Sequence, residues 1–396
     1  MCPLCHRSLA EVADFYWNAL TTAQRCALRR GLAGRTWTVG TACSGSDSVV
    51  HVLERLGRPC GYSFMHLFSC ENDPDKQAWV REHWPGLPQL FSDICQLHTG
   101  RCLNVLAGLE EDVPAVDIFI AGFVCKSLSS ENNQRAAHAD CISAGTGKTG
   151  STFEGLRRYV QRVRPKIVIC ENVVGLLKRN RGERPQIADV GEAFQRLRYH
   201  FDYKQVDARN YLLPHRRTRV WMWAVREDIS AALAAQRVRC VLEQLEQPEP
   251  APLRTFLDVS ATLAAQHVLP RQDLNLREAQ ALSDVLSSPS VQDLAKESLD
   301  ALIVDVSKSA GRAPWCVGAA PCALPGSRLF WRHRQCVLTP REVAALQGIW
   351  AADFRFLADW CADKHRARVV ADMAGNAFTS TVCMAVCLAV LATISR

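Results

Sequence analysis

Two apolar runs of this chain each end in a residue that can do chemistry. Residues 117–122 form the first run, and Cys125 follows it in a polar turn; the second run leads directly to Glu171. If both runs are buried parallel strands that end side by side, the thiol and the carboxyl lie at one edge of a sheet. Open α/β sheets bind their ligands at that edge. A thiol beside a carboxylic acid suits covalent catalysis on a ring that is protonated as it is attacked.

The elements that must position these residues follow an alternating pattern. Short β-branched runs, predicted as strands, cover 36–42, 66–71, 117–122, 166–171 and 219–225. Between the first two runs, Val49, Val52, Leu53 and Leu56 recur at helical spacing. Strands that alternate with helices predict βαβ units and a largely parallel sheet, and therefore an α/β fold.

The rest of the chain divides around this pattern. Residues 1–35 are predicted as a helical extension and 36–226 as the first part of a large domain. The sequence changes character after Arg226, and 227–333 is predicted as a smaller inserted domain with more loops, a frequent place for substrate recognition. Regular pattern returns in 334–396. The glycines of 145–150 match the letter of a nucleotide-binding loop, but no strand precedes them, so they are predicted to belong to a mobile loop after Cys125.

Composition and charge indicate a soluble globular protein. The 396 residues are 48% hydrophobic and 22% charged, enough for one large domain with a smaller one, or for two domains. The net charge of +7 matters through clusters of arginine: 157, 158, 162 and 164; 179, 181 and 184; and 216, 217 and 219. Such clusters are either the footprint of a polyanion partner or solvated helix faces.

The 18 cysteines do not predict a disulfide framework. Several lie in apolar runs, where cysteine packs as a small hydrophobic residue; these are Cys70, Cys170, Cys383 and Cys387. No secretory signal opens the chain, so an intracellular protein with reduced thiols is predicted.

Neither a metal site nor a membrane span is predicted. Cys2, Cys5 and His6 could hold part of a zinc site, but no second pair follows at a suitable spacing. Residues 382–394 are apolar but too short to span a bilayer, and are predicted as a buried helix.

Further motifs surround Cys125 and Glu171 in a fixed order. A turn containing Cys43, Ser44 and Gly45 follows the first strand, Glu71-Asn72 ends the second, and Asp93-Ile94 comes next. After Glu171-Asn172-Val173 come Pro214-His215-Arg216-Arg217-Thr218-Arg219, then Leu338 to Gly348, and finally Gly375-Asn376-Ala377. The segment from Leu338 to Gly348 predicts a helix start. Thr339 would be its N-cap, Pro340 its first helical residue, and Glu342 lies three residues after the cap.

The order and spacing of these motifs resemble those of the cytosine-5 methyltransferases of DNA and their tRNA-modifying relatives. The resemblance covers about residues 36–226 and 334–390. It implies a Rossmann-like class I methyltransferase sheet, with 227–333 as target-recognition domain and 334–396 returning to the cofactor pocket. Five positions depart from the family pattern: Cys43 stands for an aromatic residue, Asp47 for a glycine, Val124 for a proline, and Lys126 and His215 each for a glutamine.

The resemblance also implies site roles. The catalytic residues would be Cys125, Glu171, Arg217 and Arg219, with the two arginines on one side of a strand facing the thiol. S-adenosyl-L-methionine would be bound by Cys43, Ser44, Gly45, Glu71, Asn72, Asp93, Ile94, Asn376 and Ala377. Lys126 would favour the thiolate of Cys125 or point to solvent. Residues 128–152, with Arg135, His138 and Lys148, would close over the site.

The activity that the resemblance implies is methyl transfer to carbon 5 of cytosine in DNA, with base flipping and a covalent bond to Cys125. Two alternatives stay open: the same chemistry on tRNA or another structured RNA, and a catalytically silent homologue that binds nucleic acid or S-adenosylmethionine. The expected protein is a monomer without a metal, acts away from membranes, and is nuclear if eukaryotic.

Overall fold

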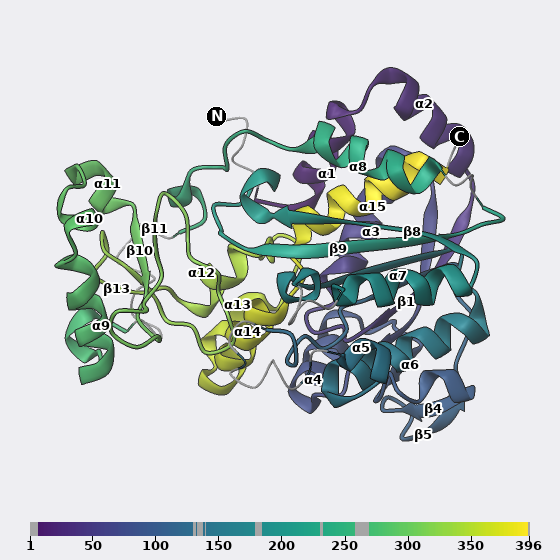
Figure 1. The fold of residues 1–396 in the computed structure, drawn as a ribbon, viewed down its shortest axis with the longest axis horizontal. Coiled ribbons are helices and arrows are strands. Elements are labelled where there is room, and N and C mark those ends of the chain that lie inside the picture. Colours follow the sequence, from purple (N-terminus) through teal and green to yellow (C-terminus); the bar gives the residue numbers. More distant parts are fainter. Residues whose placement is uncertain are drawn as a thin grey trace. The chain divides into compact units, whose positions relative to one another are not determined.

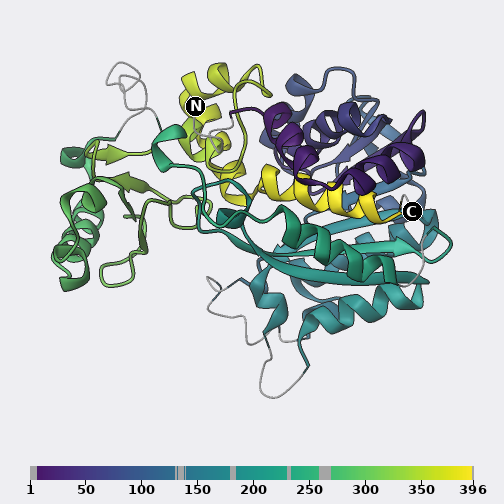
Figure 2. The same ribbon diagram turned by 90° about the horizontal axis from the view of Figure 1, so that it is seen from above.

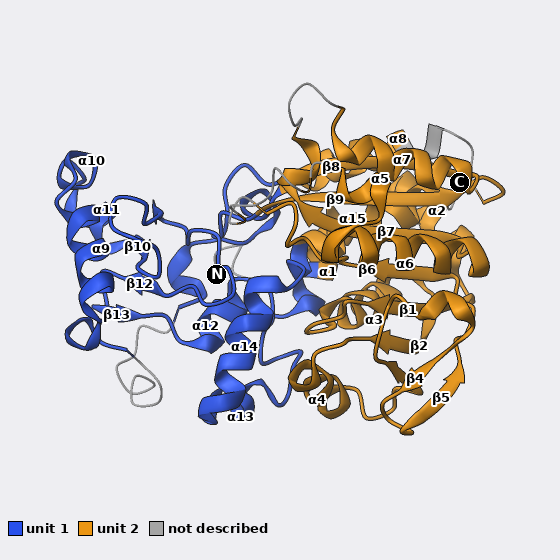
Figure 3. Ribbon diagram, turned by 60° about the horizontal axis from the view of Figure 1, so that its bottom comes forward, with its two compact units in different colours: residues 1–12, 207–217, 247–381 blue, residues 13–206, 218–246, 382–396 orange. Residues whose placement is uncertain are grey.

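The computed structural model describes residues 7–129, 132, 138, 140–178, 184–229, 233–257 and 269–394. Its chain divides into two compact units, coloured in Figure 3. The large-sheet unit comprises 13–206, 218–246 and 382–396, and the small-sheet unit comprises 1–12, 207–217 and 247–381. These bounds differ from the predicted domain boundaries, because helices after residue 334 belong to the same compact unit as most of the inserted segment.

The large-sheet unit contains a nine-stranded sheet in the order β5-β4-β3-β2-β1-β6-β7-β9-β8. Its strands are β1 (Thr36–Ala42), β2 (Ser63–Cys70), β3 (Gln89–Phe91), β4 (Arg101–Asn104), β5 (Leu109–Asp112), β6 (Ile118–Ala121), β7 (Ile167–Val173), β8 (Tyr199–Asp207) and β9 (Thr218–Arg226). Strands β3, β2, β1, β6 and β7 pair in parallel, and β9 runs antiparallel to β7. The predicted α/β fold and its five strands are confirmed; β3, β4, β5 and β8 are additional.

Helices cover both faces of this sheet (Figures 1 and 2). They are α1 (Leu9–Ala19), α2 (Thr22–Leu32), α3 (Ser48–Cys60), α4 (Pro74–His83), α5 (Cys141–Ala144), α6 (Gly147–Val163), α7 (Gln186–Arg196), α8 (Leu233–Leu245) and α15 (Ser380–Ile394). On one face, Tyr159 of α6 packs on Phe68 and Phe119 of the sheet, and Phe194 of α7 stacks on Phe201 of β8. The predicted helical extension before residue 36 and the predicted buried terminal helix are confirmed as α1, α2 and α15.

The sequence suggested that residues 145–150 belong to a mobile loop, and this prediction is wrong. Gly145 ends α5 with a positive φ of 65°, and α6 begins at Gly147. The second half of the expected lid is therefore helical. The reason is tertiary: Thr149 is fully buried and Phe153 packs on Phe123, so this glycine-rich segment is fixed against the sheet.

The small-sheet unit has its own antiparallel sheet and core. The sheet has the order β11-β10-β12-β13, from β10 (Leu302–Asp305), β11 (Trp315–Val317), β12 (Leu329–Trp331) and β13 (Cys336–Val337). Its helices are α9 (Leu276–Leu286), α10 (Pro289–Gln292), α11 (Lys296–Asp300), α12 (Pro340–Ala345), α13 (Leu357–Ala362) and α14 (Lys364–Asn376). Helix α12 starts as predicted, with Thr339 and Glu342 forming a capping box.

Two findings concern the predictions about metals and membranes. In the described ranges, no single helix is both long and apolar enough to cross a bilayer, although α14 and α15 taken together reach that length as a bent pair. No group of three metal-ligating side chains is found within those same ranges. Cys2, Cys5 and His6 lie outside them, as do Arg135, Arg179 and Arg181.

Candidate active site

The turn that carries Cys125 is attached to the neighbouring strand. Strand β6 ends at Ala121, which pairs with Cys170 of β7. The side-chain amide of Asn172, one residue after Glu171, donates to the carbonyl oxygen of Phe123 at 2.9 Å. Because this bond joins the residue after the acid to the turn before the thiol, it fixes the Cys125 turn at the end of β7.

Helix α6 holds the same turn from its other side. Thr152 accepts a hydrogen bond from the backbone N–H of Val124 at 3.2 Å, and Thr149 accepts one from Ser127 at 3.0 Å. Cys125 itself is half-buried, and its carbonyl oxygen accepts from the N–H groups of Leu128 and Ser129 at 3.0 Å. Five hydrogen bonds therefore fix the backbone on both sides of the thiol. Sequence reasoning missed Thr149 and Thr152, whose only signal is their spacing on one helix face.

Close packing at Gly175 adds to this support. A Cβ atom built on Gly175 would lie 2.0 Å from the carbonyl oxygen of Leu128, so only glycine fits there. Lys126, between these contacts, is exposed. Of the two predicted positions for Lys126, its exposure favours the one that faces solvent.

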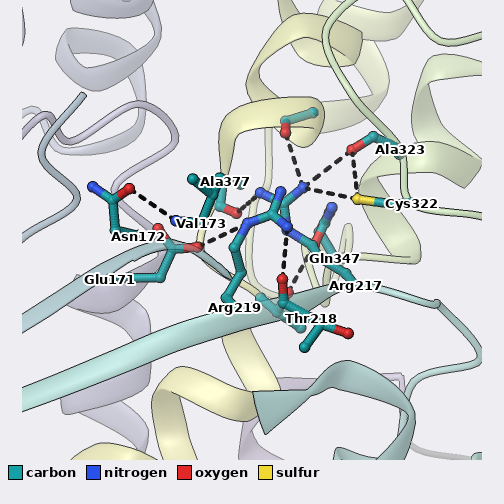
Figure 4. A network of polar contacts seen from close by, with 12 residues as sticks. Glu171, Asn172, Val173, Arg217, Thr218, Arg219, Cys322, Ala323, Gln347 and Ala377 are labelled. Atoms are coloured by element: carbon teal, nitrogen blue, oxygen red, sulfur yellow. Dashed lines mark hydrogen bonds and ion pairs between the residues drawn. The ribbon is translucent and has the colours of Figure 1, made fainter. Parts of the chain in front are cut away.

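The carboxylate of Glu171 forms an ion pair with Arg219. The two residues come from antiparallel strands, where Glu171 lies opposite Trp221 and Val173 lies opposite Arg219. Arg219 Nε lies 3.2 Å from Glu171 Oε1, and both side chains are nearly buried (Figure 4). A pair this well shielded from water orients the carboxyl group strongly. Two residues that the sequence placed separately among the catalytic residues are thus in direct contact.

Arg217 makes a different set of contacts, among them three with carbonyl oxygens of the small-sheet unit. It lies one residue before β9, is buried, and donates to the carbonyl oxygens of Ala323 at 3.1 Å, Gly375 at 3.0 Å and Ala377 at 3.0 Å (Figure 4). The guanidinium thereby ties the end of α14 to the loop before β12. These contacts support a structural role for Arg217, which the resemblance had placed among the catalytic residues.

Replacing Arg217 tests which role it has. Arg217→Ala leaves three carbonyls without their donor, so we expect the free energy of unfolding to fall by about 3 kcal/mol. Arg217→Lys should recover part of that loss, since a single ammonium reaches fewer acceptors. Urea unfolding measures both variants. Wild-type stability together with lost methyl transfer would instead assign Arg217 to the catalytic group.

The first turn of the predicted cofactor site lies at the carboxyl ends of β1 and β2. Gly45 has a positive φ of 53°, and its backbone N–H donates to Glu71 Oε2 at 2.8 Å. Glu71 Oε1 accepts from the N–H groups of Asn72 at 2.9 Å and Asp73 at 3.0 Å. Ser44 bonds to Cys70 through both its backbone and its hydroxyl. Glu71 therefore organises the turn that Cys43, Ser44 and Gly45 form.

The third predicted acid lies one strand further along the same edge. Asp93 follows β3, is half-buried, and receives a hydrogen bond from the N–H of Cys95 at 2.8 Å through Oδ1. Ile94 beside it is buried in the core of the large-sheet unit. Asn376 and Ala377, the last two predicted cofactor residues, belong to the small-sheet unit, where Asn376 bonds to Asp372.

A buried acid beneath the turn was not predicted. Asp47, at the position where the family has glycine, keeps a left-handed backbone with φ 52° and is 1% exposed. Its Oδ2 accepts from the Ser69 hydroxyl and lies 3.8 Å from His66 Nε2, while its Oδ1 has no hydrogen-bond partner among the described residues. Burial raises the pKa of Asp47 to about 7, and burial lowers the pKa of His66 to about 4. The carboxyl group of Asp47 therefore changes between its neutral and its charged form near neutral pH.

This pair makes stability depend on pH in a specific way. Below about pH 6.5 the folded chain keeps a proton on Asp47, whereas the unfolded chain keeps one on His66 instead, so the two effects cancel down to about pH 4. From about pH 6.5 to 7 only the folded state holds the proton, so the stability of the wild type falls as pH rises.

Asp47→Asn removes one side of that balance. Its stability should rise with pH between about 4 and 6.5, where His66 alone titrates. Above pH 7 it should exceed that of the wild type by up to about 4 kcal/mol, the equivalent of a three-unit pKa shift. Urea unfolding at several pH values measures this, with exposed Asp140→Asn as control. Parallel curves for wild type and Asp47→Asn would contradict the assignment.

Taken together, the fold and this edge define a class of protein. A parallel sheet with a glycine turn after β1 and acids after β2 and β3 is the arrangement of Rossmann-like class I methyltransferases. Consistent with this, the structure superposes on the S. pombe Dnmt2 methyltransferase with a TM-score of 0.54 at 13% identity, covering 90% of this chain and 98% of that one.

The family follows from the sequence comparison. A family model described as C-5 cytosine-specific DNA methylase matches residues 42–313, and the chain belongs to this family. The predicted resemblance is therefore confirmed.

Among the relatives, a DNA (cytosine-5-)-methyltransferase DMT5 of Cryptococcus neoformans var. grubii is 27% identical over an alignment of 424 positions, gaps included, which covers 90% of this chain and 17% of the relative. The type II methyltransferase M.HhaI of Haemophilus parahaemolyticus is 26% identical over 205 residues, 52% of this chain and 50% of the relative. The chain thus spans about a sixth of the length of the fungal relative and half of the bacterial one.

Proposed function

We propose that this protein transfers a methyl group from S-adenosyl-L-methionine to carbon 5 of cytosine in DNA. The observation that carries the proposal is the arrangement at the ends of β6 and β7. Asn172 bonds the Cys125 turn to β7, and Arg219 holds Glu171 beside it. A fixed thiol and an oriented carboxyl on adjacent strands are the two groups that addition to a cytosine ring requires.

The steps follow from these groups. The target cytosine leaves the helix, because its ring carbons are not accessible within the stack. The sulfur of Cys125, as thiolate, forms a bond to carbon 6 while Glu171, which takes up a proton from water when the cytosine binds, gives that proton to ring nitrogen 3. The ring electrons displaced by this addition make carbon 5 nucleophilic. Once carbon 5 carries the methyl group, a base such as water removes its proton, the bond to sulfur breaks, and Glu171 recovers its proton from the ring.

The residues of the turn after β1 fit the cofactor. Glu71 uses three backbone donors, and a carboxylate has about four lone-pair positions, so one remains for a ribose hydroxyl. Nothing lies within 4 Å of the position that a Cβ atom on Gly45 would take, so a ligand can approach the backbone closely. Asp93 would meet the adenine amino group. When bound, S-adenosylmethionine supplies the methyl group.

The remaining roles belong to the same proposal. Arg219 would keep Glu171 oriented, and Arg217 would hold the small-sheet unit together so that it can act as target-recognition part. The names of the relatives favour DNA over RNA as the substrate. A protein that acts in this way on a genome, as a monomer, works inside the cell, and in the nucleus in a eukaryote.

Transfer of labelled methyl from S-adenosylmethionine to duplex DNA and to bulk tRNA, measured in parallel, tests the proposal. Label at carbon 5 of cytosine in the DNA is the expected result. Label in the RNA alone would replace the substrate, and label in neither, with cofactor binding intact, would show a silent homologue.

A further inference from the structure

The arginine clusters that the sequence offers as a polyanion footprint are largely used inside the protein. Arg157 and Arg158 both pair with Glu154, with N–O distances of 2.7 Å. Arg162 donates to the carbonyl oxygens of Leu97 and Val113 at 3.0 Å. Arg184 pairs with Asp189 and Glu192, and the contacts of Arg217 and Arg219 are given above. These guanidinium groups are already neutralised or hydrogen-bonded, so they are weak candidates for phosphate contacts.

Four other arginines gather at one end of the large-sheet unit. Arg29 and Arg30 are in the last turn of α2, Arg58 is in the last turn of α3, and Arg35 directly precedes β1. All four are exposed. Helix α2 is well defined, because Thr21 and Gln24 form a capping box at its start, and basic residues in its last turn also suit the helix dipole.

Printed backbone contacts show that these four residues are neighbours. Arg29 Nε donates to the carbonyl oxygen of Pro59 at 3.2 Å, next to Arg58. Gly34 donates to Gly61 at 3.1 Å, and Ser63 donates to the carbonyl of Arg35 at 3.0 Å. The end of α2, the end of α3 and the starts of β1 and β2 are thus joined at one place, which we call the α2–α3 arginine patch (Arg29, Arg30, Arg35 and Arg58).

The patch carries positive charge that no acid within the described ranges pairs with. In the portion of the chain that the structure describes, none of its four arginines forms an ion pair, and only Arg29 has a further partner, the ring of Trp17 at 5.1 Å. Nor does either helix expose a large apolar side chain in that portion. Protein interfaces generally need apolar or aromatic anchors at their centre, whereas phosphate recognition needs guanidinium groups.

The patch is also distinct from the active site. It lies at the amino ends of the parallel strands, whereas Cys125, Glu171 and Glu71 follow their carboxyl ends. Strand β1 has seven residues, so the two edges of the sheet are about 20 Å apart. Phosphates bound at the patch therefore belong to a different stretch of polyanion from the one that carries the target base.

We propose that the α2–α3 arginine patch binds the phosphate backbone of duplex DNA, as a second DNA contact apart from the active site. The proposal rests on the proposed function for the choice of polyanion. Because each guanidinium contacts phosphate and not base edges, the patch raises affinity for DNA of any sequence and makes that affinity depend on salt.

The experiment compares two triple variants of equal charge. Arg30→Gln, Arg35→Gln and Arg58→Gln together remove the patch, leaving Arg29 because of its contact with Pro59. The control removes three exposed arginines elsewhere in the same unit, by Arg81→Gln, Arg196→Gln and Arg237→Gln. Both variants lower the net charge by the same amount. Anisotropy of a labelled duplex, titrated with protein at several salt concentrations, gives the slope of log affinity against log salt.

The patch variant should lose about 0.9 in this slope for each phosphate contact removed, up to about 3 in all. The control should keep a slope within one contact of the wild type, and a third variant with lysine at the three patch positions should restore it. Binding of S-adenosylhomocysteine, measured by calorimetry, should be unchanged in all of them, which shows that the fold is intact.

Two results would overturn the proposal. The first is an equal slope for patch and control variants. The second is loss of binding to an acidic peptide, such as a polyglutamate chain, without loss of DNA binding, because it would assign the patch to an acidic protein segment. A failure of the proposed function is separate, since it appears as absent methyl transfer by the wild type.

Discussion

Cys125→Ala is expected to abolish methyl transfer, by about 10⁴-fold or more, while S-adenosylhomocysteine binds as it does to the wild type. The physical reason is that no other group in the described site can form the bond to carbon 6, so carbon 5 never becomes nucleophilic. The structure also predicts that the change is local. The hydrogen bonds described above fix the turn through the backbone of Val124, Ser127 and Leu128, and these bonds remain when the side chain is shortened.

Two measurements check this expectation. One is the rate of label transfer to DNA, with Cys240→Ala as the matched control, since Cys240 is an exposed thiol on α8. The other uses DNA containing 5-fluorocytosine, in which carbon 5 has no proton to lose, so elimination stops. The wild type should then remain joined to the DNA under denaturing conditions, and Cys125→Ala should not. Turnover by Cys125→Ala would place the nucleophile elsewhere.

Glu171→Gln is expected to have the second largest effect, a loss of about 10²- to 10⁴-fold in the rate of transfer. Glutamine keeps the shape of the side chain and can still bond to the cytosine ring. It cannot give a proton to ring nitrogen 3, so the charge that develops when the thiolate adds is not neutralised. Binding of DNA and cofactor should therefore change much less than the rate.

The ion pair with Arg219 requires a control for stability. Glu171→Gln leaves a nearly buried guanidinium without its carboxylate, which costs about 1–3 kcal/mol of folding free energy. Urea unfolding separates that loss from the loss of rate. Arg219→Lys is the matched variant, because it keeps the charge beside Glu171 and alters its orientation only. If Glu171→Gln and Arg219→Lys lost activity equally, orientation and not proton donation would be the function of Glu171.

Near the thiol, where the sequence departs from the family pattern, the structure contains a hydrogen bond that restrains the chain instead. Proline before the cysteine would stiffen the turn through its fixed φ. Val124 lacks that restraint but has an N–H group, and this N–H donates to Thr152. A hydrogen bond thus supplies the rigidity that a proline ring would give. A similar exchange occurs at Asp47, whose carboxyl group bonds to Ser69 where a glycine would have no side chain.

By itself, the sequence determined the fold class, the five main strands and the order of the site motifs. A buried strand is recognised from the length and spacing of its hydrophobic residues, which are local features. The helix start at Thr339 is local too, because Thr339 and Glu342, the two residues of the capping box, are three positions apart. The positions of Cys125 and Glu171 at strand ends followed from the same local pattern, since parallel strands present their carboxyl ends at one edge.

Only the tertiary structure decided which polar groups are neutralised. The sequence could not show that Glu154 takes up two arginines, that Arg217 is buried among three carbonyl oxygens, or that Asp47 faces Ser69 and His66. It equally could not show that the arginines at the ends of α2 and α3 form no ion pair with the acids that the structure describes. Charge and pKa depend on neighbours that are distant in the chain, and local residue patterns carry no information about those neighbours.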